Sequence, residues 1–179
     1  VQACSDAAYT NALNVPGSGG ASTTYSYTLS LDRPFIVDGG DLNDRIVLDG
    51  DLGNTVTVRG MNGSDSLVVV GKNAASATYT PGTNNVNGLD GRSDLRGTVT
   101  VGSTTINFQE LETTGSVTVQ DVTTVTLVTP GSADTLQVTG PAGTQAQVDG
   151  SSDGVALVPL RITGVANLVV DTATNDGAG

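Results

Sequence analysis

The sequence contains no histidine and no tryptophan, and it has a single cysteine. Histidine is the side chain that most often transfers protons near neutral pH, so its absence excludes every catalytic triad that uses histidine as the base. A zinc site built from the usual cysteine and histidine ligands is excluded as well. The lone Cys4 cannot form a disulfide bond within the chain.

Lysine and glutamate, which favour helices, are also scarce. Of the 18 acidic residues all but two are aspartate, which prefers turns, and only 7 residues are basic. The formal net charge of −11 disfavours binding to nucleic acid or anionic lipid and favours solubility or cation binding. No apolar run approaches the ~20 residues that a membrane-spanning helix needs.

What the sequence does contain is a long series of short alternating segments. They are rich in Val, Thr, Ile and Leu and are bounded by Gly, Asp, Asn or Pro, which is the pattern of strands separated by turns. No segment has the 3.6-residue periodicity of an amphipathic helix. We therefore predict an all-β protein with strands at 25–31, 45–49, 55–59, 66–70, 97–102, 105–111, 115–120, 124–129, 134–139, 144–149, 154–160 and 167–171.

Two motifs recur within this series. The octet x-D-x-[IL]-x-[LV]-x-G occurs at 43–50, 64–71 and 133–140, and x-[TS]-V-T-V-x occurs at 54–59, 97–102 and 115–120. Internal repetition with one strand per ~10 residues predicts a parallel β-solenoid (β-helix) with rungs of roughly 20 residues. A β-sandwich or jelly roll is the alternative, because strands at this spacing are equally expected there.

Alternation within the strands also predicts which side chains face the core. Valine, leucine and isoleucine point inward, and threonine points outward. The predicted inward positions are Ile46, Val56, Val58, Leu67, Val117, Val119, Leu136 and Val138.

The first part of the chain differs from the rest. Residues 1–24 form an N-terminal extension with a Gly/Ser hinge at 17–22, and residues 25–179 form a single β-repeat domain with a polar insertion at 72–96. The strand at 25–31 follows the hinge, so it can add to the open edge of a neighbouring copy and form a head-to-tail homopolymer. Capping of its own core is the alternative. The predicted self-assembly residues are Tyr25, Tyr27, Leu29 and Leu31.

Paired carboxylates offer a catalytic alternative, since polysaccharide lyases and glycosidases use clustered acids. The candidates are Asp90 and Asp94 with Arg92, or Glu110 with Glu112, whose i, i+2 spacing would place both on one face of a strand. No aromatic platform for sugar stacking accompanies either group. We therefore expect the protein not to be an enzyme.

Two further segments, "GGDLNDRIV" (39–47) and "GMNGSDSLV" (60–68), match the calcium-binding nonapeptide G-G-x-G-x-D-x-U-x at all but one defined position. With "GSADTLQVTG" and "GTVTVGSTTINFQELETTGSVTVQ", they resemble the degenerate repeats of bacterial surface and extracellular β-helix proteins, distant relatives of haemolysin-type (RTX) repeat proteins. The resemblance covers about residues 38–71 and 96–171. It implies Ca²⁺ at Asp44 and Asp65.

The two nonapeptide-like copies lie 21 residues apart rather than nine, so consecutive turns would not enclose an ion between them. Hydrogen bonds from aspartate side chains to the backbone of turns are the alternative to calcium binding. We expect no other cofactor.

Together these features predict a non-enzymatic extracellular structural protein, a self-assembling subunit of a surface filament or matrix whose partner is itself, with no nucleic acid bound and no membrane insertion. The alternative is an adhesive or spacer module of a larger cell-surface repeat protein. Val1 is not an initiator methionine, and the composition is acidic, poor in lysine and rich in Thr, Gly and Val. We therefore expect export through a signal peptide that has been removed.

Overall fold

The fold is all-β, as predicted. The computed structural model describes residues 12–14, 34–50, 52–82, 86–87, 93–112, 116–140 and 145–176, and this part of the chain contains strands and turns but no helix. It accordingly has no helix that could cross a membrane.

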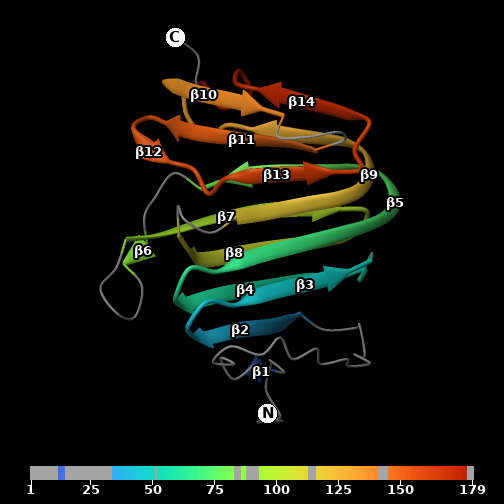
Figure 1. Ribbon diagram of the computed structural model, residues 1–179, viewed down its shortest axis with the longest axis vertical. Coiled ribbons are helices and arrows are strands. Elements are labelled where there is room, and N and C mark those ends of the chain that lie inside the picture. Colours follow the sequence, from blue (N-terminus) through green and yellow to red (C-terminus); the bar gives the residue numbers. More distant parts are fainter. Residues whose placement is uncertain are drawn as a thin grey trace.

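The fourteen strands of the described part join one mixed sheet, which is organised in two series (Figure 1). Series A runs through β1 (Ala12–Asn14), β2 (Phe35–Asp41), β4 (Thr55–Asn62), β8 (Thr104–Leu111), β7 (Ser93–Val101), the second half of β5 (Ser66–Pro81), the second half of β9 (Ser116–Val128) and β14 (Asn167–Asp171). Series B runs through β3 (Arg45–Asp49), the first halves of β5 and β9, β13 (Leu160–Thr163), β11 (Gln145–Ser152) and β10 (Asp134–Thr139). The short β6 (Val86–Asn87) pairs with β7, and β12 (Val155–Ala156) pairs with β11.

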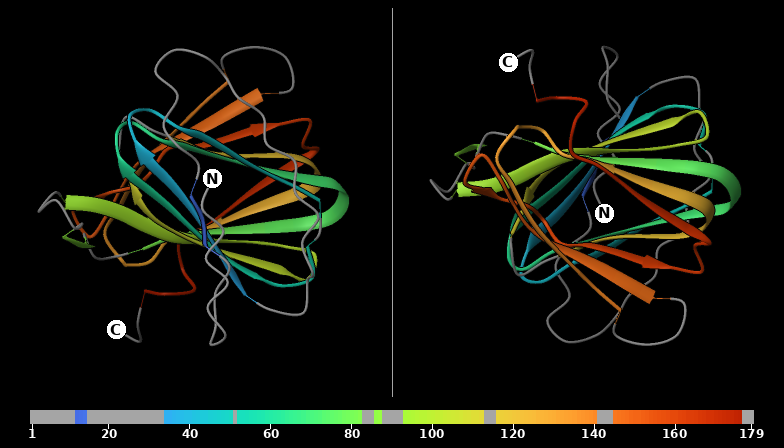
Figure 2. Two further views of the ribbon diagram at one scale, coloured as in Figure 1. Left: turned by 90° about the horizontal axis from the view of Figure 1, so that it is seen from below. Right: turned by 90° about the horizontal axis from the view of Figure 1, so that it is seen from above.

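The strands β5 and β9 belong to both series because each bends in its middle. In β5 the register shifts between Val70 and Ala74, where Lys72 and Asn73 have positive φ angles. In β9 the bend falls at Asp121, whose φ is 57°. Figure 2 shows the two series as layers that are connected where β5 curves from one to the other.

Parallel neighbours in the sheet are separated by a regular step along the chain. Phe35 pairs with Val56 in series A and Arg45 pairs with Ser66 in series B, so the first step is 21 residues in both. The next step, from Ser66 to Ser116, is 50 residues, and the last, from Val117 to Leu160, is 43. Only the first step has the predicted length of roughly 20 residues.

The two longer steps each contain an antiparallel meander. In series A the chain passes from the second half of β5 to β7 and then to β8, which returns it to the side of β4. In series B it passes from β10 to β11 and then to β13, which returns it to the side of β9. Each meander therefore inserts strands between neighbours that a simple repeat would pair directly.

Part of the predicted polar insertion, residues 72–96, lies in the strands of the first meander. Residues 72–81 do not leave the sheet but continue β5, and Tyr79 is only 1% exposed. Leu95, near the other end of the predicted insertion, is also buried. Ala77, Tyr79 and Pro81 alternate along the strand and are all buried, but the polar residues around them made this strand pattern hard to recognise in the sequence.

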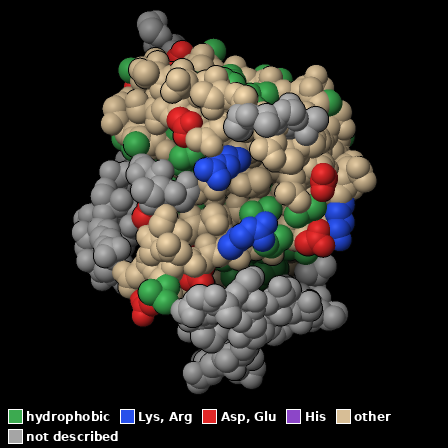
Figure 3. All heavy atoms as spheres, in the orientation of Figure 1, with side chains coloured by type: hydrophobic (Ala, Val, Ile, Leu, Met, Phe, Trp, Pro, Cys, Tyr) green, Lys and Arg blue, Asp and Glu red, His purple; other side chains and the backbone are tan. Residues whose placement is uncertain are grey.

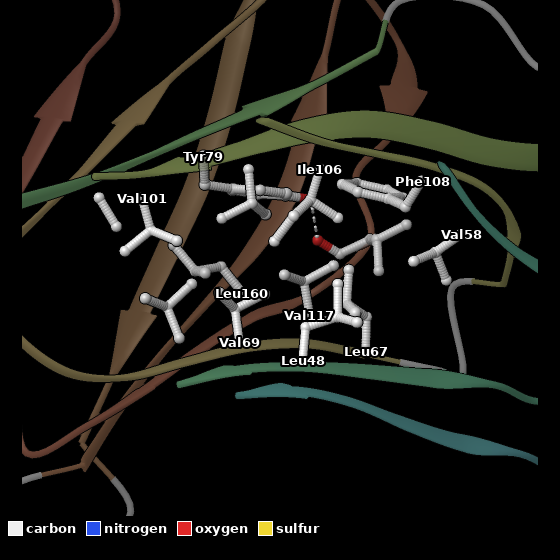
Figure 4. Packing of buried hydrophobic residues seen from close by; sticks show 14 of the residues in the cluster. Leu48, Val58, Leu67, Val69, Tyr79, Val101, Ile106, Phe108, Val117 and Leu160 are labelled. Atoms are coloured by element: carbon white, nitrogen blue, oxygen red, sulfur yellow. Dashed lines mark hydrogen bonds between the residues drawn. The ribbon is translucent and has the colours of Figure 1, made fainter. Parts of the chain in front are cut away.

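Apolar side chains from both series meet in one core (Figure 4). The Tyr79 ring stacks on Phe108 with 6.0 Å between ring centroids and 15° between planes. Its hydroxyl donates a hydrogen bond of 2.8 Å to the Val158 carbonyl, close to β13 of the other series. This bond satisfies a polar group that would otherwise be costly to bury.

Most of the predicted inward positions are confirmed. Leu136 is half-buried, and Val138, which pairs with buried Val148 and so faces the same side, is 54% exposed; burial is therefore not complete at these two positions. Both lie on β10, the last strand of series B, which no further described strand covers. The confirmed, buried positions are Ile46, Val56, Val58, Leu67, Val117 and Val119.

Charged side chains are scattered rather than gathered on the face shown in Figure 3, where uncharged side chains and backbone dominate. Among the described residues, two ion pairs join charged side chains of neighbouring strands or bends. Arg59 lies 3.7 Å from Asp38, and Lys72 lies 2.9 Å from Asp49. The Lys72–Asp49 pair is exposed, and exposed pairs contribute about 0–1 kcal/mol, whereas Arg59 and Asp38 are half-buried.

Candidate functional site: stacked acidic turns

Three acidic segments lie above one another where series A passes into series B. They are residues 38–45, from the end of β2 to the start of β3, residues 59–66, from the end of β4 to the start of β5, and residues 109–112 at the end of β8. We call them the acidic turns. They are stacked because their strands pair side by side: Gly40 of β2 pairs with Met61 of β4, and Arg59 of β4 pairs with Gln109 of β8. The two nonapeptide-like motifs form the first two acidic turns.

The backbone of these turns is left-handed at several positions. Gly40 and its ladder partner Met61 have φ angles of 105° and 74°, and Leu42 and Glu110 have φ angles of 77° and 58°. Leu42 and Met61 are the two positions at which the sequence departs from the nonapeptide glycines. A non-glycine residue in this region costs on the order of 1 kcal/mol, so both turns carry backbone strain.

Glycine is required where one acidic turn touches the next. A Cβ atom on Gly60 would collide with the Glu110 carbonyl oxygen and lie 2.7 Å from Oδ2 of Asp65. A Cβ atom on Gly39, one step earlier, would lie 2.6 Å from the Gly60 carbonyl oxygen and 3.3 Å from Oδ2 of Asp44. The absence of side chains at these glycines lets the carboxylates pack against the backbone.

Side-chain oxygens tie each acidic turn to the one before it. The Asp44 N–H donates to Oδ1 of Asp65 at 2.7 Å, and the Asp65 N–H donates to Oε2 of Glu112 at 3.1 Å. The Ser64 N–H donates to Oδ1 of Asn43 at 2.9 Å. These bonds satisfy backbone donors that the bend removes from the sheet.

The electrostatics of the turns centre on Asp65. Its side chain is fully buried, and Oδ2 accepts no hydrogen bond. Burial is the main cause that raises the pKa of Asp65 to about 7; the charges of Glu112 and Asp44 raise it further, and the bond from the Asp44 N–H opposes the shift. Burial also raises the pKa of Asp44. Asp65 therefore changes charge near neutral pH.

The predicted calcium ligands Asp44 and Asp65 occupy equivalent places in successive acidic turns. One oxygen of Asp65 is already occupied by the Asp44 N–H. Within the described ranges, no group of three or more Asp, Glu, Cys or His side chains is placed to hold a metal ion. Calcium binding at these two residues stays a prediction of the resemblance.

Calcium binding can be tested by thermal unfolding. Ca²⁺ takes six to eight oxygen ligands, and a ligand raises the melting temperature only when it binds the folded state preferentially. We expect millimolar Ca²⁺ to leave the melting temperature unchanged. A calcium-dependent rise that is lost in Asp44→Asn would instead assign the ion to this turn.

The predicted catalytic pairs are placed differently from what their spacing suggested. Glu110 is buried and has a left-handed backbone, and Glu112 lies just beyond the end of β8, so no extended strand carries both. Oε2 of Glu112 accepts a hydrogen bond from the Asp65 N–H. Asp94 lies in β7, but its side chain is outside the described residues, as are Asp90 and Arg92.

The structural role of Glu112 was missed because the meander separates it from Asp65 by 47 residues, which breaks the 21-residue spacing. The predicted self-assembly residues are not described, and neither is Cys4. They are Tyr25, Tyr27, Leu29 and Leu31.

Comparison of the chain with protein-family models, with curated proteins and with solved structures finds no match. The similarity to RTX-type repeats therefore stays a prediction from the motifs.

Proposed function

We propose that this chain is a non-enzymatic extracellular structural protein, a β-solenoid interrupted by two meanders, whose copies join head to tail in a surface filament or matrix. The observation that carries the proposal is the pair of open ends of the sheet. At one end β3 pairs only with β5; at the other, β14 pairs only with β9 and β10 only with β11, among the strands that the structure describes.

Open sheet edges favour association. Each edge presents a row of backbone N–H and C=O groups that another strand can pair with, and stacked repeats have to cap or pair their ends. The two ends of this sheet lie at opposite ends of the molecule (Figure 1). Contact between unlike ends repeats without closing, so it yields a filament rather than a dimer.

The parallel pairings support the solenoid over the β-sandwich. The parallel pairs are β2 with β4, β4 with β8, β3 with β5, β5 with β9, and β9 with both β13 and β14. Sandwiches and jelly rolls are built from antiparallel pairs. Among the described strands, antiparallel pairing is confined to the two meanders and their short flanking strands.

The acidic turns support a structural role for the carboxylates. Asp65 and Glu112 each accept a hydrogen bond from the backbone of an adjacent turn, so a function in shaping the stack accounts for both. We expect no lyase or hydrolase turnover on polysaccharides. Turnover that disappears in Glu110→Gln or Asp94→Asn would contradict the proposal.

Particle mass tests the proposed function. We expect the mass of the purified chain, measured by sedimentation over a range of concentrations, to rise well above that of the 17.9 kDa monomer, and negative-stain images to show linear particles. A monomer at every concentration would contradict self-assembly and favour the alternative, an adhesive or spacer module of a larger surface protein.

A further inference from the structure

Two columns of apolar side chains run through the sheet from one end to the other. Each column consists of inward-facing residues that are paired, strand by strand, in the ladder. The series A column is Phe35, Val56, Ile106, Val99, Tyr79, Leu127 and Val170. The series B column is Ile46, Leu67, Val117, Leu160, Val148 and Val138.

The columns are covered at one end and uncovered at the other. Phe35 and Ile46, at the first end, are each 7% exposed, and every later member is buried except the last. At the second end, Val170 is 37% exposed and Val138 is 54% exposed. The core is therefore open where β10 and β14 end the sheet.

Other side chains complete this open end. Leu136 of β10 and Leu168 of β14 pack against the core but are only partly buried. Leu136, Val138, Leu168 and Val170 thus form an apolar surface, which we call the acceptor end, flanked by two strand edges without a partner among the described strands. Apolar surface of this kind, beside free strand edges, is typical of a site for an added strand.

We infer that the acceptor end binds residues 25–31 of a second copy of this chain. The inference rests on the proposed function and names its joint. Residues 15–33 connect β1 to the start of β2, and their length, at up to ~3.3 Å per residue, allows a strand within them to reach beyond its own sheet. The segment "YSYTLSL" has no charge and alternates large apolar side chains, as the columns do.

The direction of the contact follows from the position of the two ends. The described start of the body, at β2, lies at the opposite end of the molecule from β10 and β14 (Figure 1). A copy that donates residues 25–31 from its β2 end to one neighbour still presents its own acceptor end to a third copy. One joint of this kind therefore repeats along a single axis.

Adjacent residues of β14 provide a matched test. Val170 faces the core, because it pairs with buried Leu127, whereas Val169 faces the opposite side of the sheet and is 46% exposed. We expect Val170→Asp to weaken self-association by about tenfold or more, since it places a charge in the joint. Val169→Asp should leave association within about twofold of the wild type.

The same comparison on series B uses Val138→Asp against Gln137→Asp, because Gln137 is an exposed residue of β10 whose side chain points to the opposite side of the strand. Melting temperature and circular dichroism of each variant report whether the monomer still folds. Association that is unchanged in folded Val170→Asp and Val138→Asp would overturn the acceptor end but leave self-assembly intact. A wild-type chain that is always monomeric would overturn both.

Cross-linking locates the donor strand directly. In a Cys4→Ser background, copies carrying Tyr27→Cys are mixed with copies carrying Val170→Cys and treated with a flexible thiol–thiol cross-linker. We expect a covalent dimer in this mixture, and several-fold less when Val47→Cys, at an exposed position of β3 at the other end of the sheet, replaces Val170→Cys. Equal yields in the two mixtures would overturn the assignment of residues 25–31 to the acceptor end.

Discussion

Val58 and Thr57 are neighbours in the middle of β4, yet their environments differ. Val58 is fully buried and pairs with Phe108, whereas Thr57 is partly exposed on the other side of the strand. Alternation of this kind is local, so it can be predicted from the sequence. It does not predict the exposure of Val138, which depends on whether another strand follows.

Substitution by aspartate at these two positions measures the difference. Val58→Asp buries an unpaired charge, which costs several kcal/mol, a large part of the ~5–15 kcal/mol by which a domain is stable. Thr57→Asp keeps its charge near solvent and should cost about 1 kcal/mol or less. Urea unfolding followed by circular dichroism provides both values. Equal losses would show that the assigned facing of β4 is wrong.

The buried Asp65 predicts how stability depends on pH. Its carboxyl has a pKa of 3.8 in the unfolded chain and about 7 in the folded protein. Below pH 3.8 it is protonated in both states, so its contribution to the free energy of unfolding is fully present there. Between these values only the unfolded chain ionises, so stability falls as the pH rises. Above about pH 7 the decline stops.

Asp65→Asn isolates this effect. Asparagine keeps the oxygen that accepts the Asp44 N–H but cannot ionise, so the loss of stability between about pH 4 and pH 7 should be smaller by a few kcal/mol than in the wild type. Asp176→Asn, at an exposed position, is the control. If the free energies of unfolding of Asp65→Asn and wild type run parallel across this range, Asp65 does not titrate as described.

At the scale of elements, the bends decide how the chain is arranged. The acidic turns pass the chain from series A to series B, and the bends in β5 and β9 pass it back. Gly60 lies in the acidic turn at residues 59–66, where the chain crosses from series A to series B. Its backbone lies against the Glu110 carbonyl and the Asp65 carboxylate. A methyl group has no space there.

Gly60→Ala should therefore destabilise the protein by about 1–3 kcal/mol or more, because backbone atoms have to move to accept the Cβ atom. The matched control is Gly140→Ala, since the nearest atom to a Cβ there is the Gln145 carbonyl oxygen at 3.8 Å. Thermal unfolding of both variants compares them. A stable Gly60→Ala protein would mean that the acidic turns do not touch as closely as described.

The sequence predicted many strands but not their partners. The segments at 45–49, 134–139 and 167–171 coincide with β3, β10 and β14. However, the motif x-[TS]-V-T-V-x lies in β4, β7 and β9, which have different neighbouring strands. Of these three, β7 runs antiparallel to its neighbours β5 and β8. Strand propensity is encoded locally, whereas pairing depends on residues far away in the chain. In the candidate site, the equivalent positions of Asp44 and Asp65 could be predicted from the sequence, but the hydrogen bond between Glu112 and the Asp65 N–H could not.

At the scale of the molecule, the two series share strands and a core. β5 and β9 each contribute one half to either series, and the Tyr79 hydroxyl binds the Val158 carbonyl across the core. Neither series can separate from the other without breaking strands that both contain. The described part of the chain is therefore one cooperative unit.

This arrangement predicts a single unfolding transition. Far-UV circular dichroism, which reports the sheet, and tyrosine fluorescence, which is sensitive to the surroundings of buried Tyr79, should give the same midpoint in urea. The measurement is made with Val170→Asp, the variant in which association should be weakest, so that dissociation does not add a second phase. Two separate midpoints would show that the series unfold independently.

The meander in series A has a consequence for synthesis on the ribosome. In the sheet, β7 and β8 lie between β4 and the second half of β5, but the ribosome makes them after both. A nascent chain that has emerged only as far as Pro81 cannot close the sheet without pairing strands that are not neighbours in the finished protein. Productive folding has to wait until Leu111 has emerged, and premature pairing of β4 with β5 is the error that a chaperone would have to prevent.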